Sequence, residues 1–135
     1  MASFLEQGCS DMTIGEAINK IDELQPNSYD RGMKVAWLRQ LDMELWREVI
    51  QTHEGAPEQG EPDYGDDTED DTELLVEGPY DCMYVHWLQS RIDYALAEYG
   101  KFNNSNAAFE ADRMAWRMWY HRNHMPKQEA RGRFF

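Results

Sequence analysis

The chain has 135 residues, of which 26 are Asp or Glu and 13 are Lys or Arg, so its formal net charge is −13. This length suits one domain with one hydrophobic core, and the negative charge argues against binding nucleic acid through phosphate neutralisation. No apolar run approaches the ~20 residues that span a bilayer, so we expect a soluble protein without membrane contact.

The start of the chain has no secondary-structure signal. Residues 1–12 show no periodicity, no basic residue and no apolar run of signal-peptide length, which predicts a flexible leader on an unexported chain. Cys9 and Cys82 lie 73 residues apart without a CxxC or His-pair context. We therefore expect free thiols in a reducing compartment.

Two helices are predicted in the first half of the domain, which we place at residues 13–126. Thr13 and Glu16 form a capping-box pattern that opens the first helix, and Pro26 ends it. The second helix runs from about residues 28–30 to about Thr52. Its main apolar stripe consists of Leu38, Leu41, Leu45 and Val49. Further apolar residues extend this arc, although Arg39 and Asp42 interrupt it: Val35, Met43, Trp46 and Ile50.

The acidity is concentrated between the second and third helices. Residues 54–77 contain eleven acidic residues and no Lys or Arg, so 24 residues hold −11 of the net charge. Their composition predicts a mobile loop that buries little, and Glu73–Val76 is compatible with a short strand that pairs within the loop as a hairpin. The densest carboxylate run is Asp66, Asp67, Glu69, Asp70, Asp71 and Glu73.

Two further helices complete a mainly α, four-helix bundle-like single domain. Gly78–Pro79 is a helix-entry signal, Gly100 is a stop signal, and Asn103 or Asn104 can cap a fourth helix that reaches about Arg122. The expected core face of the third helix is Tyr84, Leu88, Ile92, Ala95 and Tyr99. That of the fourth helix is Phe109, Trp116 and Tyr120.

The last two helices carry more apolar surface than one core requires. A surface helix needs a single stripe a little over 100° wide, yet each of these helices has a second line of apolar residues. Either a tightly wrapped bundle buries this extra arc, or neighbouring copies bury it; large apolar side chains suit such a contact. Several such faces favour head-to-tail contacts that close a ring. We predict an inter-subunit surface formed by Met83, Trp87, Tyr94, Ala107, Ala111, Met114 and Met118.

No pattern in the sequence indicates catalysis, a metal site or a cofactor. His121 and His124 are three residues apart, but no HExxH motif or Cys pair accompanies them. A calcium-loop register starting at Asp66 fails, because Asp71 stands where the sharp turn needs Gly and Leu74 stands at a ligand position. We expect a protein without enzymatic activity, metal or cofactor.

A family resemblance rests on the third and fourth helices. The run GPYDCMYVHWLQSRIDYALAEYGKFNNSNAAF at 78–109, followed by NHMPK at 123–127, resembles small proteins encoded among the head-completion genes of long-tailed bacteriophages. The opening MTIGEAINKIDELQPN, the segment around residues 37–42 and THEG at 52–55 extend the similarity over roughly residues 12–127. These proteins resemble the head–tail connector, or adaptor, family. The leader and the unusually acidic loop depart from the pattern, so no role is transferred to them.

The resemblance implies a structural virion protein: a helical subunit that forms a ring beneath the portal and joins it to the neck or tail. It implies a homo-oligomer matching the twelve-fold portal, with the portal and a neck or tail-completion protein as partners. DNA would be met only as it passes through the channel. The location would be the head–tail junction of the virion, and the host cytoplasm during assembly.

The end of the chain is a basic and aromatic tail, residues 127–135. Terminal Phe side chains bury large areas and Arg suits interfaces, so the tail is either an arm that docks on an adjacent protein or a frayed end. Its candidate docking residues are Lys127, Arg131, Arg133, Phe134 and Phe135. An alternative function for the whole chain is an acidic inhibitor of phage origin that imitates DNA.

Overall fold

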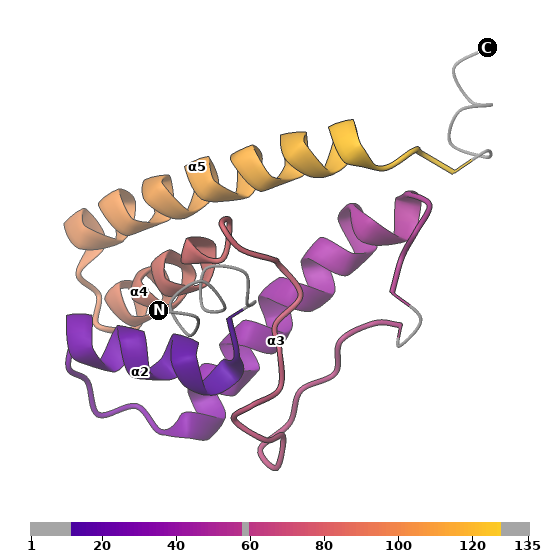
Figure 1. The fold of residues 1–135 in the computed structure, drawn as a ribbon. Helices are drawn as coiled ribbons and strands as arrows, with labels where there is room; N and C mark the ends of the chain where they lie inside the picture. The colour runs from indigo at the N-terminus through magenta and orange to yellow at the C-terminus, as the bar shows by residue number, and fades with distance from the viewer. Residues whose placement is uncertain (1–11, 58–59, 128–135) are drawn as a thin grey trace, which may run out of the picture.

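The computed structural model describes residues 12–57 and 60–127, and within these ranges the chain is mainly helical, as predicted (Figure 1). The helices are α2 (Ile14–Leu24), α3 (Arg31–Glu48), α4 (Cys82–Ala95) and α5 (Tyr99–Asn123), with a 3₁₀ turn, η1 (Ile50–Thr52), after α3. No strand occurs in the described ranges. Of the predicted leader, residues 1–11 lie outside them, and Met12 is buried in the core.

Side-chain caps fix where the first two helices begin. The Thr13 hydroxyl accepts a hydrogen bond from the backbone N–H of Glu16 at 3.2 Å, and the Thr13 N–H donates one to the Glu16 carboxylate. Asp30 caps α3 in the same way, accepting from the Met33 N–H at 2.9 Å. Each cap satisfies N–H groups that have no partner inside the helix, so the predicted starts of both helices are confirmed.

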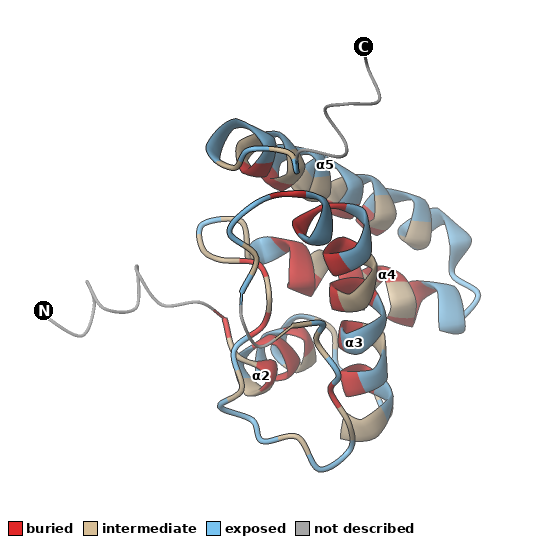
Figure 2. Cartoon of the chain, turned by 90° about the vertical axis from the view of Figure 1, so that its right-hand side faces the viewer, coloured by how far each residue is buried: buried red, intermediate tan, exposed pale blue. Residues whose placement is uncertain are grey.

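Helix α4 is the centre of the domain. Its apolar residues Met83, Tyr84, Trp87, Leu88 and Ile92 are buried over about half of its circumference, and the buried residues Val85, Ser90 and Asp93 extend the buried arc over most of the rest. This wide buried arc is possible because α2, α3 and α5 all pack against α4. The burial colouring shows the same arrangement, with red concentrated on α4 and on the sides of α2 and α3 that face it (Figure 2).

Helices α4 and α5 join at a tighter turn than the sequence predicts. Ala97 has a left-handed φ of 59°, and the Glu98 N–H bonds to the Asp93 carbonyl while the Ala97 N–H bonds to that of Tyr94. This is the Schellman pattern, in which the left-handed position usually holds glycine. The predicted stop at Gly100 is therefore wrong, and Gly100 lies in the first turn of α5.

None of the helices in the described ranges is long and apolar enough to cross a membrane.

Candidate interaction surfaces

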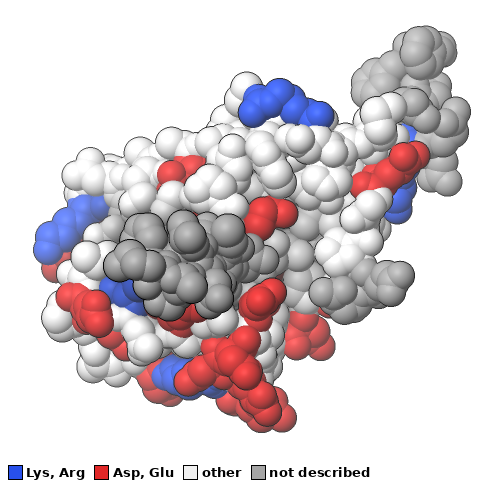
Figure 3. All heavy atoms as spheres, in the orientation of Figure 1, with Lys and Arg blue, Asp and Glu red and all other residues white. Residues whose placement is uncertain are grey.

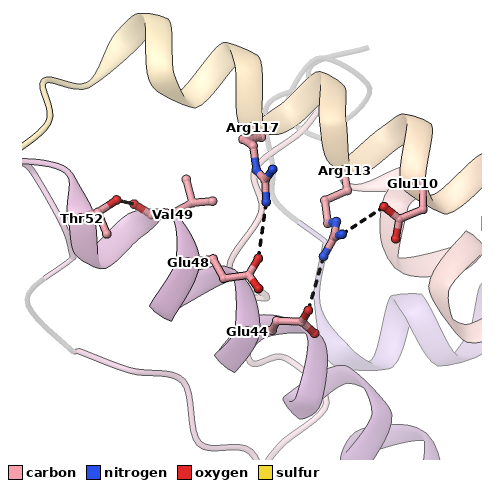
Figure 4. A network of polar contacts seen from close by, with 7 residues as sticks. All are labelled: Glu44, Glu48, Val49, Thr52, Glu110, Arg113 and Arg117. Atoms are coloured by element: carbon pink, nitrogen blue, oxygen red, sulfur yellow. Dashed lines mark hydrogen bonds and ion pairs between the residues drawn. The ribbon is translucent and has the colours of Figure 1, made fainter. Parts of the chain in front are cut away.

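One face of α5 is held firmly against the rest of the domain. Phe109, Trp116 and Tyr120 are buried, which confirms the predicted core face. Beside this apolar contact, Arg113 pairs with Glu44 and Arg117 pairs with Glu48, each at 3.4 Å (Figure 4). The two pairs have the same separation along the chain, so α5 runs in the same direction as the end of α3.

The opposite face of α5 is an apolar stripe in contact with solvent. Met114 and Met118 expose 53% and 52% of their surface, and Ala107, Ala111 and Ala115 on the same side are exposed as well. Figure 2 shows the outer side of α5 in pale blue along much of the helix. A contiguous line of exposed apolar side chains on one helix face can form a surface for contact with another protein. We call the five residues the α5 stripe.

Two residues of the predicted inter-subunit surface are instead in the core. Met83 is fully buried and Trp87 is 6% exposed. Trp87 packs on Phe109 with ring centroids 5.0 Å apart, and its indole N–H donates to the Trp37 carbonyl at 2.8 Å. For these two residues the first of the two explanations holds, because the bundle itself buries this part of the second line of α4. Tyr94, in contrast, is 56% exposed near the α4–α5 turn.

The acidic part of the chain between η1 and α4, residues 60–77, is docked on α3 through three arginines, and we call it the acidic segment. Arg47 pairs with Glu61 at 2.6 Å, Arg39 with Asp63 at 2.8 Å, and Arg31 with Asp70 at 2.7 Å. The three arginines follow one another along α3 at intervals of eight residues, whereas the residue numbers of their acidic partners decrease. The segment therefore runs antiparallel to α3. Arg31 also donates to the backbone carbonyls of Asp66 and Thr68.

The same segment also contacts the first turn of α2. The N–H groups of Ile14 and Gly15 donate to the carbonyls of Thr72 and Asp70 at 3.0 and 2.9 Å. Glycine is needed at position 15, because a Cβ there would lie 2.8 Å from the Asp70 Cβ. The hairpin considered for Glu73–Val76 is not formed, since Glu73 makes a single antiparallel bridge with Thr13 instead.

A buried carboxylate joins this segment to the core. Asp42 is completely buried and accepts hydrogen bonds from the Tyr64 and Tyr84 hydroxyls at 2.7 Å and from the Leu75 N–H at 3.0 Å. The Tyr84 hydroxyl in turn accepts from the Val76 N–H at 2.7 Å. Burial raises the pKa of Asp42 to about 6, although its three donors oppose the rise. Burial and the neighbouring Asp42 carboxylate raise the pKa of both tyrosines.

The prediction that the acidic loop buries little is therefore wrong in one respect. Tyr64, Leu74 and Val76 belong to the hydrophobic core, and the hydrogen bonds from the Leu75 N–H to Asp42 on α3 and from the Val76 N–H to the Tyr84 hydroxyl on α4 hold this stretch against both helices. The predicted carboxylate run itself is exposed at every position: Asp66, Asp67, Glu69, Asp70, Asp71 and Glu73.

Histidines gather where η1 meets the end of α5. His53 is buried, and its Nδ1 bonds to the Val49 carbonyl at 2.7 Å while its Nε2 lies 2.8 Å from Nδ1 of His121. Nδ1 of His53 must carry the proton that the carbonyl accepts, so in the neutral ring Nε2 accepts from His121. Burial and the adjacent His53 lower the pKa of His121. The ring of His124 stacks on that of Tyr120, with the ring centroids 3.8 Å apart.

The chain after α5 returns to η1 before it leaves the described range. The Glu54 N–H donates to the Met125 carbonyl at 2.8 Å, and the Lys127 N–H donates to the Thr52 carbonyl at 3.0 Å. Lys127 is exposed at this point. The other candidate docking residues of the tail lie outside the described residues: Arg131, Arg133, Phe134 and Phe135.

The described side chains that could serve in catalysis or metal binding do not form such a site. Among the described residues, no group of three or more His, Cys, Asp or Glu side chains is arranged to hold a metal ion. His86 bonds to Asp112, and burial together with Asp112 raises the pKa of the neighbouring Cys82 thiol, which disfavours a nucleophilic thiolate.

A polar cavity of about 430 Å³ opens between α2, α4 and α5. Its one buried carboxylate, Asp93, accepts hydrogen bonds from Gln25 and Ser105 at 2.8 and 2.9 Å. With its donors supplied by the protein, Asp93 ties the three helices together.

Sequence reasoning missed the residues that dock the acidic segment. The spacing of eight between Arg31, Arg39 and Arg47 was a usable signal, as was Asp42, which interrupts an otherwise apolar stripe. The partners of Asp42 could not be named, because Tyr64 and Tyr84 are 22 and 42 residues away in the chain.

Comparison with known proteins identifies no relative: no family model, no curated protein and no solved structure matches the chain.

Proposed function

We propose that the chain is a structural assembly protein, the head–tail connector subunit of a tailed bacteriophage, which forms a ring with copies of itself and joins the portal to the neck or tail. The observation that carries the proposal is the α5 stripe. The fold leaves Met114 and Met118 half exposed on a helix whose other face is anchored by buried aromatic residues and ion pairs. The choice of a phage head–tail connector among possible assemblies rests on the resemblance of residues 78–109 to phage head-completion proteins.

The anchoring of α5 supports an interface role on physical grounds. A contact surface binds more tightly when its backbone is already ordered, because less conformational entropy is lost on binding. Helix α5 is fixed along its length, by Phe109 and Trp116 in the core and by His121 against His53 near its end. The stripe is therefore presented as a preorganised surface.

The acidic segment has a place in this proposal as part of the channel wall. Its carboxylates offer no contact to DNA phosphates, so DNA would pass without being held. Replacing Asp66, Asp67, Glu69 and Asp71 by Asn or Gln tests this role. Unchanged DNA retention and ejection in the assembled particle would exclude it.

The C-terminal tail is proposed as an arm that docks on an adjacent protein. Deleting residues 128–135 tests the arm, and it spares the hydrogen bond between Lys127 and Thr52. Attachment to the portal should weaken when the tail is removed. Attachment at full strength would eliminate the arm and leave the rest of the proposal standing.

The decisive experiment combines the protein with the portal ring of the same phage and examines the mixture by electron microscopy. A second ring of density on one end of the portal is expected. Met114→Glu should reduce attachment at least tenfold, because a charge would then be buried in the contact. Met33→Glu is the matched control, since Met33 is 45% exposed but lies on α3. A portal that stays bare with the unmodified protein would refute the proposal.

A further inference from the structure

The α5 stripe has large side chains in one half and small ones in the other. Met114 and Met118 occupy its C-terminal half, and Ala107 and Ala111 occupy its N-terminal half. All four are exposed on the same face of α5, because they are spaced by four, three and four residues along a helix with 3.6 residues per turn.

This order makes the stripe complementary to itself in one orientation. If a second α5 lies antiparallel across the first, with the two-fold axis between residues 112 and 113, Met118 meets Ala107 of the other copy and Met114 meets Ala111. Each large side chain then meets a small one, as in ridges-into-grooves packing. A parallel pair in register would set Met against Met and Ala against Ala.

The charges agree with the same arrangement. In this register Arg122 faces Asn103, and Glu110 faces Ala115, so no two like charges of the exposed face oppose each other. The five residues of the α5 stripe itself are uncharged, although the chain has a net charge of −13. The acidic segment is docked on α3 and α2, and in Figure 3 the densest group of Asp and Glu side chains lies low on the molecule, with smaller patches at the height of α5. Two copies paired through α5 thus keep their acidic segments apart.

We infer that the free protein forms a two-fold pair with a second copy of itself through the α5 stripe, with the two α5 helices antiparallel. The inference rests on the proposed function in one respect: both use the same stripe. A ring is built from head-to-tail contacts between its subunits, whereas a two-fold pair uses the same surface on both copies, so this pair cannot be a contact within the ring. The pair is therefore the form of the protein before assembly, and it opens when the stripe is needed in the ring.

The small size of the contact limits its stability. Residues 103–122 span about 30 Å of helix and a helix face is about 10 Å wide, which gives roughly 300 Å² per copy. A standard stable interface buries about 800 Å² per partner, so the pair is weak and forms only at high protein concentration. Weakness suits a contact that must open during assembly.

Sedimentation measured from about 10 µM to about 1 mM protein tests the pair directly. The average mass should rise toward twice 15.9 kDa with concentration, and Met118→Glu should lower the association constant at least tenfold, whereas Met33→Glu should leave it unchanged. Association should strengthen between about 50 and 500 mM salt, because salt screens the repulsion of two acidic molecules. A monomer at all concentrations, or association weakened by salt, would overturn the inference.

Cysteine cross-linking tests the orientation. In a background with Cys9→Ser and Cys82→Ser, a mixture of Ala107→Cys and Met118→Cys proteins should form a disulfide-linked dimer under mild oxidation. Either protein alone should not, because in the antiparallel pair the two Ala107 positions are about 16 Å apart, beyond the reach of a disulfide. Dimers that form within each single variant would refute the antiparallel register. Failure of the pair while the portal still acquires a ring would leave the proposed function intact.

Discussion

Asp42 offers a test of how the acidic segment is held to the bundle. Its carboxylate is fully buried and is the shared acceptor for the Tyr64 and Tyr84 hydroxyls and the Leu75 N–H. Three donors favour the charged form, whereas removal from water favours the neutral form. Burial is the larger effect and raises the pKa of Asp42 from 3.8 to about 6.

The sign and size of the effect on stability follow from proton binding. Between about pH 4 and pH 6 the folded protein holds a proton on Asp42 that the unfolded chain has released, so the free energy of unfolding falls as the pH rises through this window. A pKa difference of about two pH units corresponds to about 3 kcal/mol. This contribution is fully present below pH 4 and is lost above pH 6.

Asp42→Asn separates this effect from all other titrating groups. The amide keeps the size of the side chain and its carbonyl accepts from Tyr64 and Leu75, but it does not titrate. In urea unfolding followed by Trp fluorescence, the stability of the wild type relative to the variant should fall by about 3 kcal/mol between pH 3.5 and pH 7. Low protein concentration is needed because the sequence pI of about 4.6 lies inside the window. A relative stability that is constant or rises with pH would show that the hydrogen bonds outweigh the burial of Asp42.

Three further predictions concern α5 and the turn before it. Ala97→Gly should raise the free energy of unfolding by about 1 kcal/mol, because φ of 59° strains any residue with a Cβ; lower stability in urea would contradict the left-handed turn. Gly100→Ala should raise it by about 0.5 kcal/mol, since position 100 is helical and a Cβ there meets only open space, and a loss would show that Gly100 ends a helix after all. Trp116→Ala should cost about 3–5 kcal/mol and Met118→Ala less than about 0.5 kcal/mol in dilute monomer; equal thermal destabilisation of the two variants would refute the division of α5 into an inner and an outer face.

The sequence predicts an element well where its ends are marked by local chemistry. The capping box at Thr13 places the first helix correctly, and the predicted start of the second helix at residues 28–30 agrees with the cap that Asp30 makes, because both caps are made by side chains within three residues of the N–H groups they satisfy. The α4–α5 turn is predicted three residues too late, because a left-handed Ala97 is rare and Gly100 is a more typical stop signal.

Burial of an apolar line is harder to predict than the line itself. The second lines of α4 and α5 look alike in sequence, but Trp87 is buried and Met118 is exposed. The difference is positional: α4 is surrounded by three helices, whereas α5 lies on the outside with one face packed. That distinction depends on the arrangement of the whole bundle, and no window of the sequence contains it.

The docking of the acidic segment also bears on the alternative of a DNA-mimicking inhibitor. Such a protein needs uncompensated carboxylates spaced like phosphates along a firm surface. The segment is firmer than its composition suggests, but the arginines that hold it pair with its acids: Glu61, Asp63 and Asp70 each lie 2.6–2.8 Å from a guanidinium nitrogen. The neighbouring carboxylates Glu44 and Glu48 on α3 are paired with arginines of α5.

Compensation at these five positions breaks any regular array of negative charge along α3. The unpaired surface of α5, in contrast, is apolar and nearly uncharged. The pairing of these five carboxylates therefore gives less support to the DNA-mimic alternative than to the proposed contact through the apolar α5 stripe.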